Sequence, residues 1–186
     1  MEITSEQFQD AVAGGVYAFE LIVTKYERLV YTVALRLLKN PEDAKDVTQE
    51  TFIKVYKNLD KCKNEKMLKS WICVIANNTS IDSIRKQKKQ STISLDAQIE
   101  TEAGQFIFEI PSDEKTPELK LIEDEGYGEL KEAIDKLPLD YRNVLILRDI
   151  HSLSYLDVAE ATNLNIGTVK SRLARARAML RKLYIP

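Results

Sequence analysis

The sequence contains few of the residues on which catalytic, metal-binding and disulfide chemistry usually depend. Its 186 residues include two cysteines and one histidine. Cys62 and Cys73 are too few and too far apart for a CxxC metal site or a disulfide framework, so we expect free thiols in a reducing compartment. His151 stands between an expected helix end and the next helix start, where we expect a solvated or helix-C-terminal role. With no nucleophile–base arrangement and no phosphate-binding glycine loop, we predict a protein that is not an enzyme and needs no metal and no cofactor.

Glycine and proline are also scarce, with six and five residues, which indicates long helices with few tight turns. No apolar run approaches the length of about 18 residues that a membrane helix needs, and the N-terminal segment is acidic. We therefore expect no membrane insertion, no secretory signal and a cytoplasmic location. Strand-like alternation is confined to Phe106–Ile110, whose apolar residues are candidates for docking on a helical surface. The fold class that these patterns predict is all-α.

The charge pattern divides the chain into two small helical domains, over residues 1–90 and 127–186, joined by a linker over residues 91–126. The linker lacks helical periodicity over most of its length. From Glu100 to Asp135 there are twelve acidic residues and three lysines. A strongly charged, proline-interrupted segment buries too little apolar surface to fold by itself, so we predict a flexible acidic linker.

The C-terminal third of the chain has the local signals of a helix-turn-helix. Ser154 is followed three residues later by Asp157, a capping-box-like start for a helix over Tyr155–Thr162. Asn163 and Asn165 tolerate turn geometry and can cap the helix that follows. The sequence therefore predicts two helices separated by a tight turn.

The second of these helices carries charge of one sign. From Lys170 to Lys182 there are six basic residues and no acidic one, although the whole chain has a formal net charge of −2. An apolar stripe at helical spacing, which we expect to face inward, comprises Val169, Leu173, Ala176 and Leu180. The neighbouring face comprises Lys170, Ser171, Ala174, Arg175 and Ala178. Long cations beside small residues suit a helix that approaches DNA closely. A solvated basic helix on an ordinary bundle is the alternative, and the capped helix and tight turn before it favour DNA binding.

The N-terminal domain begins with a long amphipathic helix over Tyr17–Leu38, which Asn40-Pro41 ends. A second helix is predicted from Glu42 to Leu59, because proline is well suited to the first helical position. Its expected core positions are Ala44, Val47, Phe52, Val55, Tyr56 and Leu59. Its other face comprises Asp46, Gln49, Glu50 and Ile53. A polar face with one isoleucine is either plain surface or a docking site.

A lysine-rich loop over Asp60–Lys69 leads to a third predicted helix, Ser70–Gln87. This helix holds the single tryptophan, Trp71, the pair Asn77 and Asn78, and a basic C-terminal end. Asparagine is unfavourable in mid-helix, but its amide can bond the edge of an unpaired base, and an aromatic ring can stack on one. From the residues alone, Asn78 is better interpreted as surface and Trp71 as core.

The order of these parts resembles the extracytoplasmic-function (ECF) group of bacterial sigma factors over nearly the whole chain. The segment that looks like the polymerase-clamp helix is PEDAKDVTQETFIKVYKNL, and the one that looks like the promoter-melting helix is KSWICVIANNTSIDSIR. The segment that looks like the −35-reading domain is LPLDYRNVLILRDIHSLSYLDVAEATNLNIGTVKSRLARAR.

The resemblance implies two helical domains on a flexible linker. It implies a protein that binds core RNA polymerase through the β′ clamp coiled coil and the β flap, and that recognises the −35 and −10 elements of promoter DNA. It would then melt the DNA and start transcription of a stress- or signal-response regulon. An anti-sigma factor, often membrane-linked, is a further implied partner.

Carried over position by position, the resemblance assigns three sets of residues. Polymerase binding is implied for Asp46, Gln49, Glu50 and Ile53; contacts to the −10 element for Asn78, Trp71, Arg85 and Lys86; and contacts to the −35 element for Lys170, Ser171, Arg175, Arg172 and Thr168. The implied role of Asn78 is the capture of a flipped base, whereas the family tryptophan is usually in packing. The chain departs from the family pattern at Cys73-Val74, where an aromatic-basic pair is common, and at Ala174, where a larger side chain is common.

Two functions from other classes are the alternatives. A one-component DNA-binding regulator would use the N-terminal domain for sensing or dimerisation and would bind a two-fold operator without polymerase. A nucleic-acid enzyme that docks through the helix-turn-helix would need a catalytic constellation, which the sequence does not display.

Overall fold

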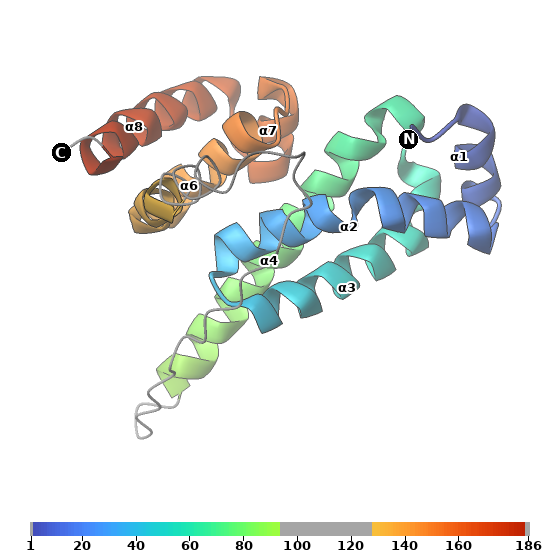
Figure 1. Cartoon of the computed structure of the whole chain (residues 1–186), viewed down its shortest axis with the longest axis horizontal. Helices are drawn as coiled ribbons and strands as arrows, with labels where there is room; N and C mark the ends of the chain where they lie inside the picture. Colours follow the sequence, from blue (N-terminus) through green and yellow to red (C-terminus); the bar gives the residue numbers. More distant parts are fainter. Residues whose placement is uncertain (1, 94–127, 185–186) are drawn as a thin grey trace, which may run out of the picture.

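The computed structural model describes residues 2–93 and 128–184, and every regular element in these ranges is helical (Figure 1). The helices are α1 (Ser5–Val12), α2 (Val16–Leu38), α3 (Pro41–Lys57), α4 (Leu68–Ile93), a helix over 128–136, α6 (Leu139–Leu145), α7 (Tyr155–Thr162) and α8 (Ile166–Tyr184). Short 3-10 turns at Leu59–Lys61 and Glu65–Met67 precede α4, and one π-helical turn, Ile146–Ile150, follows α6. The predicted all-α fold class is confirmed. Phe106–Ile110 and most of the predicted linker lie outside the described residues.

The junction between α2 and α3 follows from its local chemistry. Lys39 closes α2 in the left-handed conformation, with φ at 64°. The side chain of Asn40 accepts hydrogen bonds from the backbone N–H groups of Glu42 and Asp43, at 2.9 and 3.3 Å. Pro41 takes the first helical position, where the missing N–H group costs nothing. The backbone N–H groups at the start of α3 are therefore satisfied by a neighbouring side chain. Pro41 stands at the first helical position as predicted, whereas the cap by Asn40 was not predicted.

Helices α1 to α4 enclose an apolar core to which all four contribute. Ile22 of α2, Val55 of α3 and Ile72 of α4 have no exposed area. Each fully buried aliphatic side chain of this kind contributes roughly 1.5–3 kcal/mol to folding. This core fixes the orientation of α3 and α4, and so determines which of their faces point outward.

Two predicted details of α3 and α4 are wrong. Tyr56, expected in the core, is 50% exposed, and its ring packs edge-on against Phe19 with centroids 4.9 Å apart. The core stripe of α3 passes through Val55, and the next residue points about 100° away around the helix. The third helix begins at Leu68 and ends at Ile93, beyond both predicted ends, because a 3-10 turn continues directly into it and no breaker follows its predicted end.

The predicted helix-turn-helix is confirmed in detail. The Ser154 hydroxyl accepts from the Asp157 N–H at 3.1 Å, and the Asp157 carboxylate accepts from the Ser154 N–H at 3.1 Å, which is a complete capping box. Asn163 ends α7 in the left-handed conformation, with φ at 52°. The Asn165 side chain accepts from the Thr168 N–H at 2.7 Å and caps α8. The residues of the inner stripe of α8 are buried at Val169, Leu173 and Ala176 and partly buried at Leu180.

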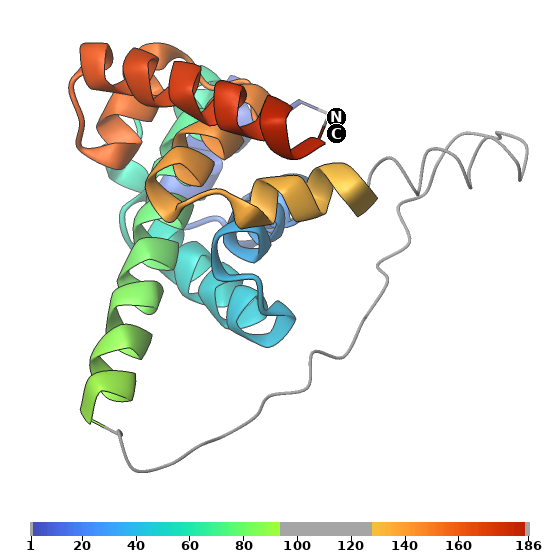
Figure 2. The same cartoon turned by 90° about the vertical axis from the view of Figure 1, so that its left-hand side faces the viewer.

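The first part of the chain (residues 2–93) and the second part (residues 128–184) pack against each other. Figures 1 and 2 show the second part lying over α2 and the N-terminal half of α4, while the C-terminal half of α4 projects away. Cys73 of α4 has no exposed area and belongs to the apolar cluster of the second part. Ile146 of the second part belongs to the cluster of the first part.

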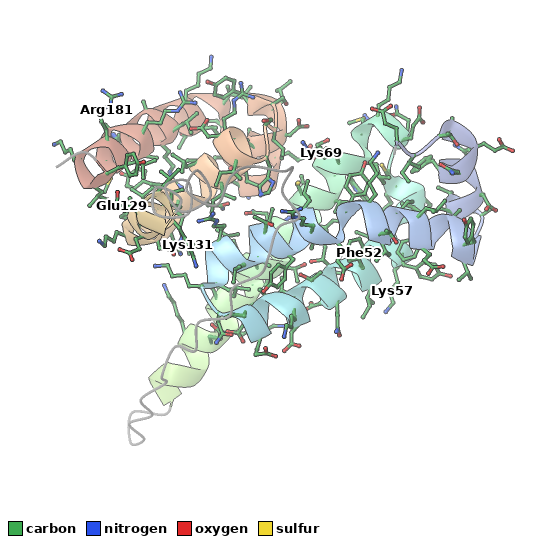
Figure 3. All side chains as sticks on the ribbon, in the orientation of Figure 1. Phe52, Lys57, Lys69, Glu129, Lys131 and Arg181 are labelled. Carbon is green, nitrogen blue, oxygen red and sulfur yellow. The ribbon has the colours of Figure 1, made fainter. Side chains whose placement is uncertain are left out.

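His151 lies in this contact region and is buried, so the expectation of a solvated histidine is wrong. It does end the π-helical turn, and its backbone N–H donates to the Ile146 carbonyl at 3.0 Å. Within the described residues its Nε2 atom has no hydrogen-bond partner. Burial lowers the pKa of His151 to about 4, and the positive charges of Lys69 and Arg36 act in the same direction. Figure 3 shows Lys69 at the border between α4 and the second part.

This depressed pKa predicts a specific acid sensitivity. The unfolded chain binds the histidine proton with a pKa near 6.5, and the folded chain binds it only below about 4. The free energy of unfolding should therefore fall as the pH falls from about 6.5 to about 4, by up to about 3 kcal/mol. His151→Gln should lack this part of the pH dependence in urea denaturation series. Equal pH dependence of variant and wild type would show that His151 does not titrate in this range.

Candidate nucleic-acid interface

The outer face of α8 presents the residues predicted to read DNA. Lys170, Ser171 and Arg175 are exposed, and Thr168 lies one turn before Ser171 on the same side. The Lys170 ammonium lies 5.6 Å from the ring centroid of Tyr155, and the Ser171 hydroxyl donates to the Thr168 carbonyl at 3.0 Å. Across the described ranges, Lys170 and Arg175 have no acidic partner. Among the residues that the structure describes, no carboxylate therefore competes with an external anion for these two charges.

Two other cations of α8 are paired with acids of the second part. Arg172 forms an ion pair with Asp140 of α6 at 3.2 Å. Arg177 contacts Asp149 with two nitrogens, at 2.9 and 2.6 Å. A two-point contact between a guanidinium and a carboxylate fixes the orientation of both side chains and also neutralises their charges. These pairs hold α8 against the helices behind it and divide its basic residues into anchors and outward-facing cations. A role of Arg172 in DNA binding stays a prediction.

On α4, Trp71, Asn78 and Arg85 occupy one face, since seven residues correspond to two helical turns. Asn78 is exposed, Arg85 and Lys86 are exposed, and Trp71 is partly buried against the core of the first part. Arg85 lies 3.6 Å from Asp82, a weak exposed pair. The structure thus places an exposed amide and an exposed cation on one side of α4, groups that suit single-stranded nucleic acid, while the Trp71 ring packs against the core.

The predicted polymerase-binding residues lie together on the exposed face of α3. Asp46, Gln49 and Ile53 are exposed, and Ile53 has 53% of its area accessible. Glu50 is partly buried and bonded to Lys54 at 2.8 Å, which lowers the pKa of its carboxyl. An exposed isoleucine inside a polar rim is the composition of a protein-binding surface.

Tyr56 extends this α3 surface, and the sequence interpretation missed it. It follows Ile53 by three residues and is exposed on the same side of the helix. Its spacing from Gln49 and Ile53 is the signal that could have found it, because that spacing matches the polar face better than the core stripe. Figure 3 places Lys57 at the same end of α3.

The second part also contains an open apolar groove of about 370 Å³, which the sequence did not predict. Its apolar lining comprises Leu130, Ile134, Leu145, Ile150, Leu180 and Tyr184. Arg177 and Arg181 lie at its border. Figure 3 shows Arg181 of α8 and Glu129 of the helix over 128–136 at this end of the molecule. Its mostly apolar lining, with Asp149 and the two arginines beside it, is of a kind that accommodates an apolar side chain.

No helix of the described residues is both long enough and apolar enough to cross a membrane. Cys62 and Cys73 are free and buried.

Two family models match the chain. Residues 22–90, which include the α3 and α4 surfaces, match Sigma-70 region 2, and residues 127–180, which include the helix-turn-helix, match Sigma-70 region 4. The ECF RNA polymerase sigma factor SigW of Bacillus subtilis is 36% identical over 170 residues, 91% of this chain and 90% of the relative. The RNA polymerase sigma-H factor of Pseudomonas aeruginosa is 32% identical over 191 residues, 99% of this chain and 97% of the relative.

Solved structures agree with these relatives. The sigma factor RpoE of Bartonella quintana, in complex with the anti-sigma factor NepR, is similar with a TM-score of 0.70 and 27% identity, over 90% of this chain and 97% of that one. CnrH in complex with the cytosolic domain of CnrY shares the fold, with a TM-score of 0.63 and 22% identity over 98% and 97% of the two chains. The chain therefore belongs to the ECF group of RNA polymerase sigma factors, the proteins that direct transcription initiation at promoters.

Proposed function

We propose that this chain guides core RNA polymerase to promoters by reading a −35 element with α8 and opening a −10 element with α4. Residues 1–90 and 127–186 would act as the two DNA-contacting domains, joined by residues 91–126. The observation that carries the proposal is the outer face of α8, where Lys170 and Arg175 are exposed without acidic partners among the described residues. The ion pairs of Arg172 and Arg177 support it, because they hold that face outward.

Duplex binding would come first. Lys170 and Arg175 would contact phosphates or base edges in the major groove, and Ser171 and Thr168 would leave room for close approach. Most of the affinity would be electrostatic and sequence-independent, and a few base contacts would supply the choice of promoter. The capping of α8 by Asn165 supports this role, since it keeps the N-terminal end of the helix rigid.

Strand opening would follow on α4. Asn78 would hydrogen-bond the edge of a flipped base, Arg85 and Lys86 would contact the phosphates, and Trp71 would support the helix from the core. Flipping a base costs a few kcal/mol, and contacts made only to the open strand would offset this cost. The chain would thereby shift the equilibrium between duplex and bubble without doing chemistry itself. The polymerase would make all bonds.

Three protein partners belong to the proposal. The α3 surface of Asp46, Gln49, Glu50 and Ile53 would bind the β′ clamp coiled coil, and the apolar groove of the second part would take a helix of the β flap. The third partner is an anti-sigma factor, which the similar complexes of other sigma factors support. The proposed work with polymerase implies a cytoplasmic location, with attachment to the membrane when a membrane-linked anti-sigma factor holds the chain. A stress- or signal-response regulon is part of the same proposal.

Run-off transcription with purified core polymerase on genomic fragments tests the proposal, and the double variant Lys170→Ala/Arg175→Ala sharpens it. We expect promoter-specific transcription to fall by at least about thirtyfold while core binding is unchanged, because each of the two lost base contacts costs roughly 1–3 kcal/mol and 1.4 kcal/mol corresponds to a factor of about ten. The control Lys131→Ala/Lys182→Ala removes the same charge from exposed lysines outside the reading face. Unchanged transcription by the first variant would remove α8 from the reading site, and protection of a two-fold operator without polymerase would support a one-component regulator.

A further inference from the structure

The contact region between the first and second parts contains two nitrogen atoms that are shielded from water. One is Nη1 of Arg36, in the last turn of α2, and the other is Nε2 of His151, at the end of the π-helical turn. Within the described residues neither atom has a hydrogen-bond partner. Arg36 is half-buried, and His151 has 8% of its area accessible. Shielded polar atoms in folded proteins are nearly always satisfied, by protein groups, by water or by a bound ion.

Positive charge gathers at the His151 ring. The charges of Arg36 and of Lys69, at the start of α4, both act on it. Lys69 is exposed and lies at the border between α4 and the second part (Figure 3). Among the residues described, no acid forms an ion pair with Arg36 or Lys69. Asp157, whose charge reaches this part of α4, is engaged elsewhere, because its carboxylate accepts from the N–H and the hydroxyl of Ser154, at 3.1 and 2.7 Å.

The three side chains are all hydrogen-bond donors. A guanidinium donates from every nitrogen and stays charged, an ammonium donates in three directions, and an imidazole donates from Nε2 in its charged form and in one neutral tautomer. A cation without a counter-ion in a partly dry region is unfavourable, and a bound anion removes that cost. A guanidinium beside a second cation suits the several oxygens of a phosphate-type ion. Because Lys69 is exposed, such an ion can reach the cluster from solvent.

We propose that Arg36, Lys69 and His151 form a binding site for a phosphate-type oxyanion, either free phosphate or the terminal phosphate of a phosphorylated metabolite. Arg36 and Lys69 belong to the first part and His151 to the second, so the anion bridges the two parts. Its concentration then adjusts how firmly they hold together. None of the three residues belongs to the α3 surface or to the DNA-reading face of α8, so the site does not rest on the proposed function.

Nuclear magnetic resonance of the imidazole ring tests the site, because His151 is the single histidine of the chain. The full-length chain, without polymerase or DNA, is titrated with inorganic phosphate near neutral pH, and potassium chloride keeps the ionic strength constant. We expect the ring signals of His151 to move to saturation. A pH titration with sulfate, whose charge does not change with pH, gives a second measurement. Sulfate should raise the pKa of His151 above its value of about 4, because an anion stabilises the charged imidazole.

Charge-removing variants make the test specific. Arg36→Gln/Lys69→Gln should bind phosphate at least about tenfold more weakly than the wild type, since two charged donors are lost. The matched control is Arg28→Gln/Lys63→Gln, which removes an exposed arginine of α2 and an exposed lysine before α4 and should bind phosphate as the wild type does. Lys69→Gln alone changes an exposed side chain, so it tests the site even if the double variant does not fold, and it should also weaken binding.

Saturable movement of the His151 signals that the control retains and the variants lose supports the site. Tighter binding of adenosine triphosphate than of inorganic phosphate would assign the site to the terminal phosphate of a metabolite, and the reverse would assign it to free phosphate. The proposal is overturned if chloride moves the signals as phosphate does, if they do not saturate, or if the variants bind as tightly as the wild type. Water would then satisfy the shielded nitrogens of Arg36 and His151.

Discussion

A chain carrying Gln49→Ala and Ile53→Asp should bind core RNA polymerase at least about a hundredfold more weakly than the wild type. Both side chains lie on the exposed face of α3, and Ile53 places 53% of its surface in water in the free chain. An apolar side chain inside a polar rim is the kind of residue that dominates a protein interface, where a single loss exceeds about 2 kcal/mol. A buried aspartate at that position would add the cost of an unpaired charge.

Fluorescence anisotropy with labelled chain and purified core polymerase measures this effect directly. The matched control is Val16→Asp, which changes an apolar residue that is even more exposed, at 74%, at the start of α2 and outside the α3 surface. Thermal unfolding should be nearly unchanged in both variants, because neither α3 side chain has a described contact that holds the fold. Wild-type affinity in the double variant would show that the clamp-binding surface lies elsewhere on the chain.

The helix-turn-helix could be predicted closely because its boundaries depend on short-range chemistry. The capping box of Ser154 and Asp157 and the αL turn at Asn163 each involve residues within a few positions of one another. The same holds for Asn40 before α3. Where a hydrogen bond connects neighbours along the chain, the residue types alone determine the partner.

Other features depend on contacts between distant segments and could not be predicted. The bond from Asn77 to Ala161 spans 84 residues, and the burial of His151 depends on the first part covering it. The pairing of Arg172 and Arg177 with acids of neighbouring elements is similar, because composition shows that α8 is basic but not which cations are already neutralised. The spacing of residues along a helix shows which of them share a face. Which face is buried depends on how the helix packs against the rest of the chain.

The candidate site contains residues whose exposure could be predicted from the sequence and one whose exposure could not. The sequence placed Asn78 on the surface and Trp71 in the core, and the structure has Asn78 exposed and Trp71 partly buried against the core. For Tyr56 the apolar character of the ring suggested the core, and the structure has it exposed. The Tyr56 ring enlarges the apolar part of the α3 surface beside Ile53, and it also packs edge-on against Phe19.

Asn78→Ala should reduce the formation of open complexes on duplex promoters by about tenfold or more. Its side chain is exposed on α4 and holds no described contact, so its loss should not change the free energy of unfolding. If the Asn78 amide bonds a flipped base, that hydrogen bond exists only in the open complex. Flipping the base costs a few kcal/mol, and without this bond less of that cost is offset, so the free-energy barrier to opening rises. Fluorescence of 2-aminopurine in the −10 element would follow opening in the polymerase complex.

Two comparisons make this prediction specific. On a template whose −10 region is already open and lacks the recognised base, the mutant and wild type should work equally well. Asn77→Ala also removes an asparagine amide, from the preceding residue, but the Asn77 amide is buried and donates to the Ala161 carbonyl. Asn77→Ala should lower the free energy of unfolding, because the buried Ala161 carbonyl loses its donor, and its effect should not depend on the identity of the −10 base. If Asn78→Ala opened duplex promoters as well as the wild type, Asn78 would be an ordinary surface residue, and strand capture on α4 would have to depend on other side chains.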